Sequence, residues 1–215
     1  METPCRCRGL GSARLTAGIP TWMKEPIVAE AETQSTNRSI IQTPAGGWVL
    51  GFMSITMEQG YLGAYLVTNS WGRPLEFRLT TAVNPSKVQQ ILYGATLETH
   101  VVAELIGKAL IEKSALPAHV ILVDHQAALE LQAGPDVMVA FVSRREGDAV
   151  GLHRVAQLPD GNASVYLRHP DPVLEERIAS LFHALPTKVD LLDPFQRAQE
   201  AMTEARKLGT GTRAA

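Results

Sequence analysis

GYLGAYLVTNSWGRPLEFRLTTA, residues 60–82, is the stretch that decides how the rest of the chain is interpreted. Two apolar runs, at 61–68 and 74–80, flank the five residues Asn-Ser-Trp-Gly-Arg. In the second run, leucine and phenylalanine alternate with charged or hydroxyl residues, which is the period-2 pattern of a strand with one solvated face. Asparagine and glycine tolerate the positive φ that a tight connection needs. The stretch therefore predicts a β-hairpin.

The chain before the hairpin shows no sustained periodicity. Residues 1–52 are rich in Thr, Ser, Gly, Pro and Ala, with one apolar run at 48–52, and we expect them to form a disordered or loosely attached tail. Three methionines are alternatives for the natural start: Met1, Met53 and Met57. The folded part is then one mixed α/β domain at 58–208, followed by a frayed C-terminus at 209–215.

The chain after the hairpin alternates between helical and strand patterns. Helices are predicted to begin near residues 86, 96, 171 and 193, and further strands to cover 119–124, 137–143, 151–158 and 163–169. Together with the hairpin, these elements predict an α/β or α+β fold. We expect a single mixed β-sheet of about six strands covered by about four helices.

The predicted helix at 96–114 has the clearest apolar stripe. Apolar residues recur at every fourth position, and Leu105 lies in the middle of this stripe, so we expect its side chain to be buried. Gly107 interrupts the helix, which indicates that another element packs close to the backbone there. The helix is therefore predicted to belong to the core.

The composition is that of an ordinary globular protein. Of the 215 residues, 45% are hydrophobic and 20% are charged, which is enough for one domain with a real core. The net charge of −2 gives no strong positive field, and we expect no binding to generic duplex nucleic acid. A local basic patch is still compatible with this charge, and Arg144 and Arg145 form an adjacent basic pair.

The two cysteines, Cys5 and Cys7, are separated by one residue and cannot form a disulfide framework. No stretch approaches the roughly 20 apolar residues that span a bilayer. No apolar segment follows the arginines near the N-terminus, so no secretory signal is expected. These observations predict a cytoplasmic protein without a membrane partner.

The common phosphate-binding and nucleophile motifs are absent. The chain contains no P-loop lysine motif, no dinucleotide fingerprint and no GxSxG sequence. None of the six histidines forms HxH, HExxH or another close ligand pair. We therefore expect no cofactor.

The strand-turn-strand sequence LVTNSWGRPLEFRL, residues 66–79, resembles the first hairpin of ribonuclease H-like nucleases. The resemblance implies an acid on the first strand, because two metal ions need bridging carboxylates. This chain has Asn69 where an acid is wanted, and Glu76 on the second strand.

The alternative function is therefore a metal-dependent hydrolase or nuclease. Asp124 and His125 end one predicted strand, and His169 ends another, so with Glu76 they are the candidate metal ligands. In the competing interpretation, Asp124 caps the turn that follows it and the histidines lie at the rim of the sheet.

The main interpretation is a non-catalytic protein-binding or scaffold subunit of a multi-protein assembly. It implies a protein partner, and the sequence does not determine the oligomeric state. Trp71 and Arg73 lie in the predicted hairpin connection and are the candidate protein-binding residues, because exposed Trp and Arg are typical of binding hot spots. The alternative is that Trp71 folds back over its own hairpin.

Overall fold

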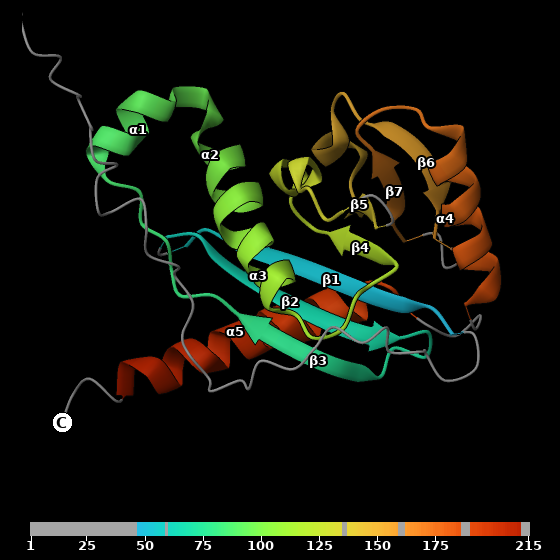
Figure 1. Ribbon diagram of the computed structural model, residues 1–215, viewed down its shortest axis with the longest axis horizontal. Helices are drawn as coiled ribbons and strands as arrows, with labels where there is room; N and C mark the ends of the chain where they lie inside the picture. Colours follow the sequence, from blue (N-terminus) through green and yellow to red (C-terminus); the bar gives the residue numbers. More distant parts are fainter. Residues whose placement is uncertain (1–46, 59, 135–136, 159–161, 186–189, 212–215) are drawn as a thin grey trace, which may run out of the picture.

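A seven-stranded mixed sheet forms the centre of the computed structural model, which describes residues 47–58, 60–134, 137–158, 162–185 and 190–211 (Figure 1). The strand order is β3-β2-β1-β4-β5-β7-β6; β1, β4 and β5 are parallel to one another, and the other pairs are antiparallel. The strands are β1 (Val49–Thr56), β2 (Leu62–Asn69), β3 (Pro74–Leu79), β4 (Val120–Val123), β5 (Met138–Ser143), β6 (His153–Gln157) and β7 (Ser164–Leu167). The predicted mixed sheet with helices is confirmed, and one strand is added.

The added strand is β1, and it corrects the predicted boundary of the tail. Residues 49–52, which were assigned to the tail, form the first half of a strand between β2 and β4. Leu50 and Phe52 are both 0% exposed. A strand buried on both faces reads as a continuous apolar run without alternation, so its pattern does not identify it as a strand. Residues 1–46 of the predicted tail lie outside the described residues.

The predicted hairpin between β2 and β3 is confirmed. The side-chain Oδ1 of Asn69 accepts hydrogen bonds from the backbone N–H groups of Trp71 and Arg73, both at 3.0 Å. Gly72 adopts a φ of +73°, which residues other than glycine rarely do. Hydrogen bonds and backbone conformations of residues close in sequence therefore form this turn, as the sequence predicts.

Helices cover both faces of the sheet (Figure 1). One face is covered by η5 (Gln126–Glu130) and by a continuous helix whose three parts are α2 (Leu97–Thr99), η4 (His100–Gly107) and α3 (Lys108–Lys113). The other face is covered by α4 (Pro172–Ala184) and α5 (Asp193–Gly211). No helix of the described part is long and apolar enough to cross a membrane. The remaining helices of the described residues are α1 (Lys87–Tyr93), η3 (Gly94–Thr96) and η6 (Glu146–Ala149).

The middle part of the long helix, η4, is a π-helix, and it corrects the prediction for Leu105. Leu105 is 37% exposed, whereas Val102 and Ile106 are buried. A π-helix has more residues per turn than an α-helix, so a stripe extrapolated at α-helical spacing turns away from the sheet. Gly107 does mark a close approach, because a Cβ there would lie 2.9 Å from Cδ1 of Leu131.

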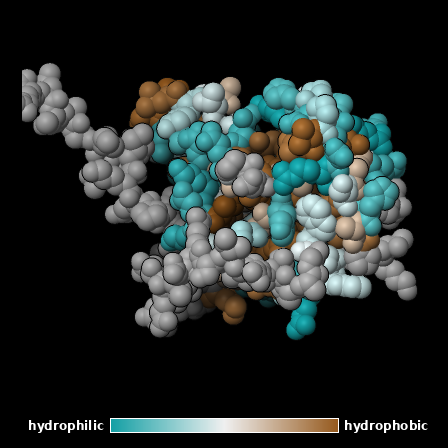
Figure 2. All heavy atoms as spheres, turned by 45° about the vertical axis from the view of Figure 1, so that its right-hand side comes forward, coloured by the Kyte–Doolittle hydropathy of each residue, from teal (hydrophilic) through white to brown (hydrophobic). Residues whose placement is uncertain are grey.

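Helix α1 buries none of its own residues. Its side chains Val88, Ile91 and Leu92 are between 63% and 73% exposed. Figure 2 shows hydrophobic side chains gathered at the upper left of the molecule, where α1 lies in Figure 1. The helix begins at Ser86, whose side chain forms a capping box with Gln89, so its stability comes from local hydrogen bonds.

Candidate functional site at the end of strand β4

The sheet has a topological switch point between its adjacent parallel strands β1 and β4. From β1 the chain continues to β2 on one side, and from β4 it continues to β5 on the other side. Ligands of open α/β sheets bind outside the carboxyl ends of strands at such a point. Here Asp124 and His125 directly follow β4 at that edge.

Asp124 joins three elements through its carboxylate. Its Oδ1 accepts the backbone N–H of Ile55 in β1 at 3.0 Å. Its Oδ2 accepts the hydroxyl of Ser54 and the Nε2 amide of Gln199 in α5, the latter at 3.1 Å. The same Nε2 also donates to Oγ of Ser54 at 3.2 Å. The carboxylate therefore links the ends of β1 and β4 to α5.

The charge of Asp124 is disfavoured in this position. Burial raises the pKa of the Asp124 carboxyl above its ordinary value of 3.8. Hydrogen bonds from Ser54, Ile55 and Gln199, and the charge of His125, act in the opposite direction without cancelling the effect of burial. Perturbed pKa values cluster at functional sites, although buried structural networks produce them too, so Asp124 is a candidate site residue.

Replacing Asp124 with asparagine is expected to change how stability depends on pH. Because the pKa of Asp124 is raised on folding, its contribution to stability is fully present below the unfolded value of 3.8 and is lost as pH rises through the folded value. The free energy of unfolding of the wild type should therefore fall relative to that of Asp124→Asn as pH rises from about 4. Urea unfolding of both proteins at a series of pH values measures this difference, and two parallel curves would contradict it.

His125 points to the opposite face of the sheet from Asp124. Its Nε2 lies 3.2 Å from Oε1 of Glu98 in α2. Its Nδ1 is buried and has no hydrogen-bond partner among the residues that the structure describes. The sheet therefore separates the two neighbours, one packed toward α5 and the other toward α2.

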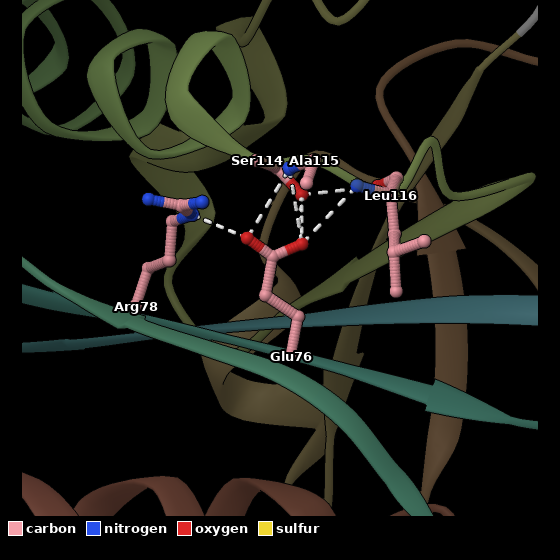
Figure 3. Close-up of polar contacts among 5 residues, drawn as sticks. All are labelled: Glu76, Arg78, Ser114, Ala115 and Leu116. Atoms are coloured by element: carbon pink, nitrogen blue, oxygen red, sulfur yellow. Dashed lines mark hydrogen bonds and ion pairs between the residues drawn. The ribbon is translucent and has the colours of Figure 1, made fainter. Parts of the chain in front are cut away.

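Glu76 has a structural role at a distance from the end of β4. Figure 3 shows its carboxylate turned toward the loop that follows α3. It accepts the hydroxyl of Ser114 at 2.9 Å and the backbone N–H groups of Ala115 and Leu116 at 3.1 Å, and it pairs with Arg78. These hydrogen bonds hold the loop against β3, and both oxygens of the Glu76 carboxylate are engaged in them or in the ion pair with Arg78.

The four candidate metal ligands are not brought together. His169 is exposed beyond the end of β7, Glu76 binds the loop after α3, and Asp124 and His125 lie on opposite faces. Within the described residues, no group of three or more His, Cys, Asp or Glu side chains is placed to hold a metal ion. The donor set therefore does not fit the metal centre that a metal-dependent hydrolase would need.

The hairpin tip lies at the other end of β2 and β3 from Asp124. Trp71 is 72% exposed, so it does not fold back over the hairpin, and Arg73 is exposed as well. An Arg197 Nη2 from α5 donates to the carbonyl oxygen of Gly72 at 2.9 Å and fixes the tip to the body. A binding role for Trp71 and Arg73 stays a prediction.

Sequence reasoning missed Ser54 and Gln199. Ser54 is a polar residue inside the apolar run of β1, which is a signal for a buried hydrogen bond. Gln199 lies on the polar side of α5 among other charged and amide residues, and its pattern contains no comparable signal.

No protein-family model matches the chain, and no curated protein matches it. Among solved structures, the chain is similar to human ENDOV, with 13% identity, a TM-score of 0.44 and coverage of 77% of this chain and 87% of that one. It is also similar to Ciona intestinalis Endonuclease V in complex with a 24mer DNA, with 12% identity, a TM-score of 0.46 and coverage of 77% and 89%. Marinitoga piezophila Argonaute, in complex with guide RNA and target DNA, gives 9% identity and a TM-score of 0.32 over 72% of this chain and 29% of that one.

These neighbours contradict two expectations from the sequence. Their names and bound molecules concern an endonuclease, DNA and guide RNA. They run against the main interpretation as a non-catalytic protein-binding or scaffold subunit and against the expectation of no binding to generic duplex nucleic acid, and neither is kept below. At these identities and TM-scores the likeness concerns the fold alone, so the role of each residue rests on the contacts described above.

Proposed function

We propose that this chain binds nucleic acid at the C-terminal ends of the parallel strands β1, β4 and β5. The observation that carries the proposal is an arginine pair, Arg144 and Arg145, beside the switch point. This class of function replaces the scaffold interpretation. A cytoplasmic location is part of the same proposal.

The arginine pair directly follows β5. Val123 at the end of β4 pairs with Phe141 of β5, so both strands leave the sheet at one edge. Arg144 and Arg145 are exposed, and in the described part of the chain neither side chain forms an ion pair. Unpaired arginines at a surface are the groups that contact phosphate oxygens and release counterions.

The backbone of this basic turn is held in place. Oγ of Ser143 accepts the backbone N–H of Arg145 at 3.0 Å and contacts Oδ2 of Asp148 at 3.1 Å. By contrast, the guanidinium groups of Arg154 and Arg168 pair with Glu146 and Glu130. In the described turn at 144–148, Arg144 and Arg145 are therefore the basic residues without an ion pair, and they lie beside Glu146 and Asp148 of the same turn.

The architecture supports nucleic acid rather than another phosphate ligand. The hairpin of β2 and β3 resembles the first hairpin of ribonuclease H-like nucleases. On the other side of β1, the sheet continues with β4 and β5, which are both parallel to β1. This support is an analogy of fold, and it concerns binding. We do not extend it to metal-dependent cleavage, because the described donor set does not fit a metal ion.

Binding of labelled single-stranded DNA, duplex DNA and single-stranded RNA tests the proposal. We expect at least one of them to bind the wild-type chain at low salt, with an affinity that falls as salt rises. The double variant Arg144→Ala/Arg145→Ala should bind more weakly, and its slope of log K against log salt should be smaller by about 2, or about one per lost phosphate contact.

Arg73→Ala is the matched control, because Arg73 is an exposed arginine at the hairpin tip, far from the end of β5 in the fold. Its salt slope should equal that of the wild type. Two results would contradict the proposal: no binding of any of the three probes at low salt, or an equal loss in the control and in the double variant.

A further inference from the structure

Ser54 and Asp124 lie side by side on neighbouring parallel strands. Met53 pairs with Val123, so the next residue along each chain comes at the same level of the sheet. Both side chains point to the face that α5 covers, where Gln199 reaches them. Ser54 is 0% exposed, so its hydroxyl has no water to bind and stays on the carboxylate.

The groups around the Asp124 carboxylate are hydrogen-bond donors. The hydroxyl of Ser54, the N–H of Ile55 and the amide of Gln199 all direct hydrogens at its two oxygens. A divalent cation such as Mg²⁺ or Mn²⁺ needs oxygen lone pairs directed at one point, usually from more than one carboxylate. On this face, Asp124 is one carboxylate surrounded by donors, and no second acid or histidine of the described chain joins it in a metal-binding group.

We infer that Ser54 and Gln199 make the end of β4 a hydrogen-bonded junction where carboxylates would make a divalent-cation site. The junction ties β1, β4 and α5 together with neutral donors, so it stabilises the edge without an ion. A consequence, which rests on the proposed function, is that nucleic acid bound at this edge is not cut by a metal ion held there.

The first experiment titrates the wild-type chain and Asp124→Asn with MgCl₂ and MnCl₂ while the melting temperature and the heat of binding are recorded. We expect the same small response from both proteins, because Asp124 does not take up the ion. A melting temperature that rises with Mn²⁺ in the wild type but not in Asp124→Asn would overturn the inference. This result is independent of nucleic-acid binding, so a failure here and a failure of the proposed function are distinguishable.

The second experiment introduces the missing carboxylates with the double variant Ser54→Asp/Gln199→Glu. Three carboxylates would then converge, and they repel one another unless a cation lies between them. We expect the melting temperature of this variant to rise by roughly 5 °C or more when Mn²⁺ is present at a hundred times its Kd. Recovery of the folded circular-dichroism spectrum on addition of Mn²⁺ would support the inference equally.

The control is Ser180→Asp/Gln90→Glu, which adds the same charge at two exposed positions, one on α4 and one on α1. It should show no ion-dependent rise. The single variant Gln199→Glu alters an exposed side chain and places a second carboxylate beside Asp124, so it should show a weaker rise. If neither the double variant nor Gln199→Glu responds to Mn²⁺ more than the control does, the inference is wrong.

Discussion

Replacing Phe52 with alanine is expected to lower the free energy of unfolding by roughly 3–5 kcal/mol. Phe52 is 0% exposed in the central strand β1, and its ring lies 5.3 Å from that of Phe195 in α5, at an angle of 85°. The substitution removes this edge-to-face contact and leaves a cavity between the sheet and α5, which the surrounding backbone cannot close.

The matched control is Phe77→Ala in the edge strand β3, where the side chain is 41% exposed. Its loss should be clearly smaller, about 1–2 kcal/mol, because water already reaches the ring. Urea unfolding with both the midpoint and the m-value measures the two effects. Equal losses for Phe52→Ala and Phe77→Ala would show that β1 does not form the centre of the core, as would a loss for Phe52→Ala below about 1 kcal/mol.

Replacing Gly63 with alanine is expected to cost roughly 1–3 kcal/mol through overpacking. A Cβ at this position of β2 would lie 2.2 Å from Cγ2 of Ile106 and 3.2 Å from Cδ1 of Ile55 and of Leu110. The Cγ2 of isoleucine is attached to its stiff, branched Cβ, so it cannot move aside without shifting η4. Glycine at 63 therefore allows the π-helix to lie against the sheet.

Gly147→Ala is the control for this substitution. No atom lies within 4 Å of the Cβ that would be added at Gly147, and its φ is not in the left-handed region. We expect its free energy of unfolding to stay within about 0.5 kcal/mol of the wild type. A chain in which both alanine variants are equally stable would contradict the close packing of η4 on β2.

The sequence by itself determined the elements whose cause lies within a few residues. The β2–β3 hairpin follows from alternation and from the Asn69 and Gly72 of its connection, and the structure closes it with these residues. Helix α4 begins as predicted, because Asp171 accepts the backbone N–H groups of Val173 and Leu174. Such hydrogen bonds form between near neighbours, so their residues can be read in order along the chain.

Other features are visible only in the tertiary structure. The apolar run at the start of β1 became the central strand because β2 and β4 bury its two edges, and these partners follow it at different distances along the chain. The prediction that Leu105 is buried was wrong because the π-helix η4 changes the number of residues per turn. Neither cause is contained in the local pattern.

The candidate site divides in the same way. The sequence placed Asp124 and His125 at a strand end, which is where they lie. Their assignment to opposite faces, the commitment of Glu76 to the loop after α3, and the convergence of Ser54 and Gln199 on Asp124 were decided by the tertiary structure. The physical reason is that Gln199 is 75 residues from Asp124, and only the packing of α5 against β1 brings its amide within hydrogen-bond distance of the carboxylate.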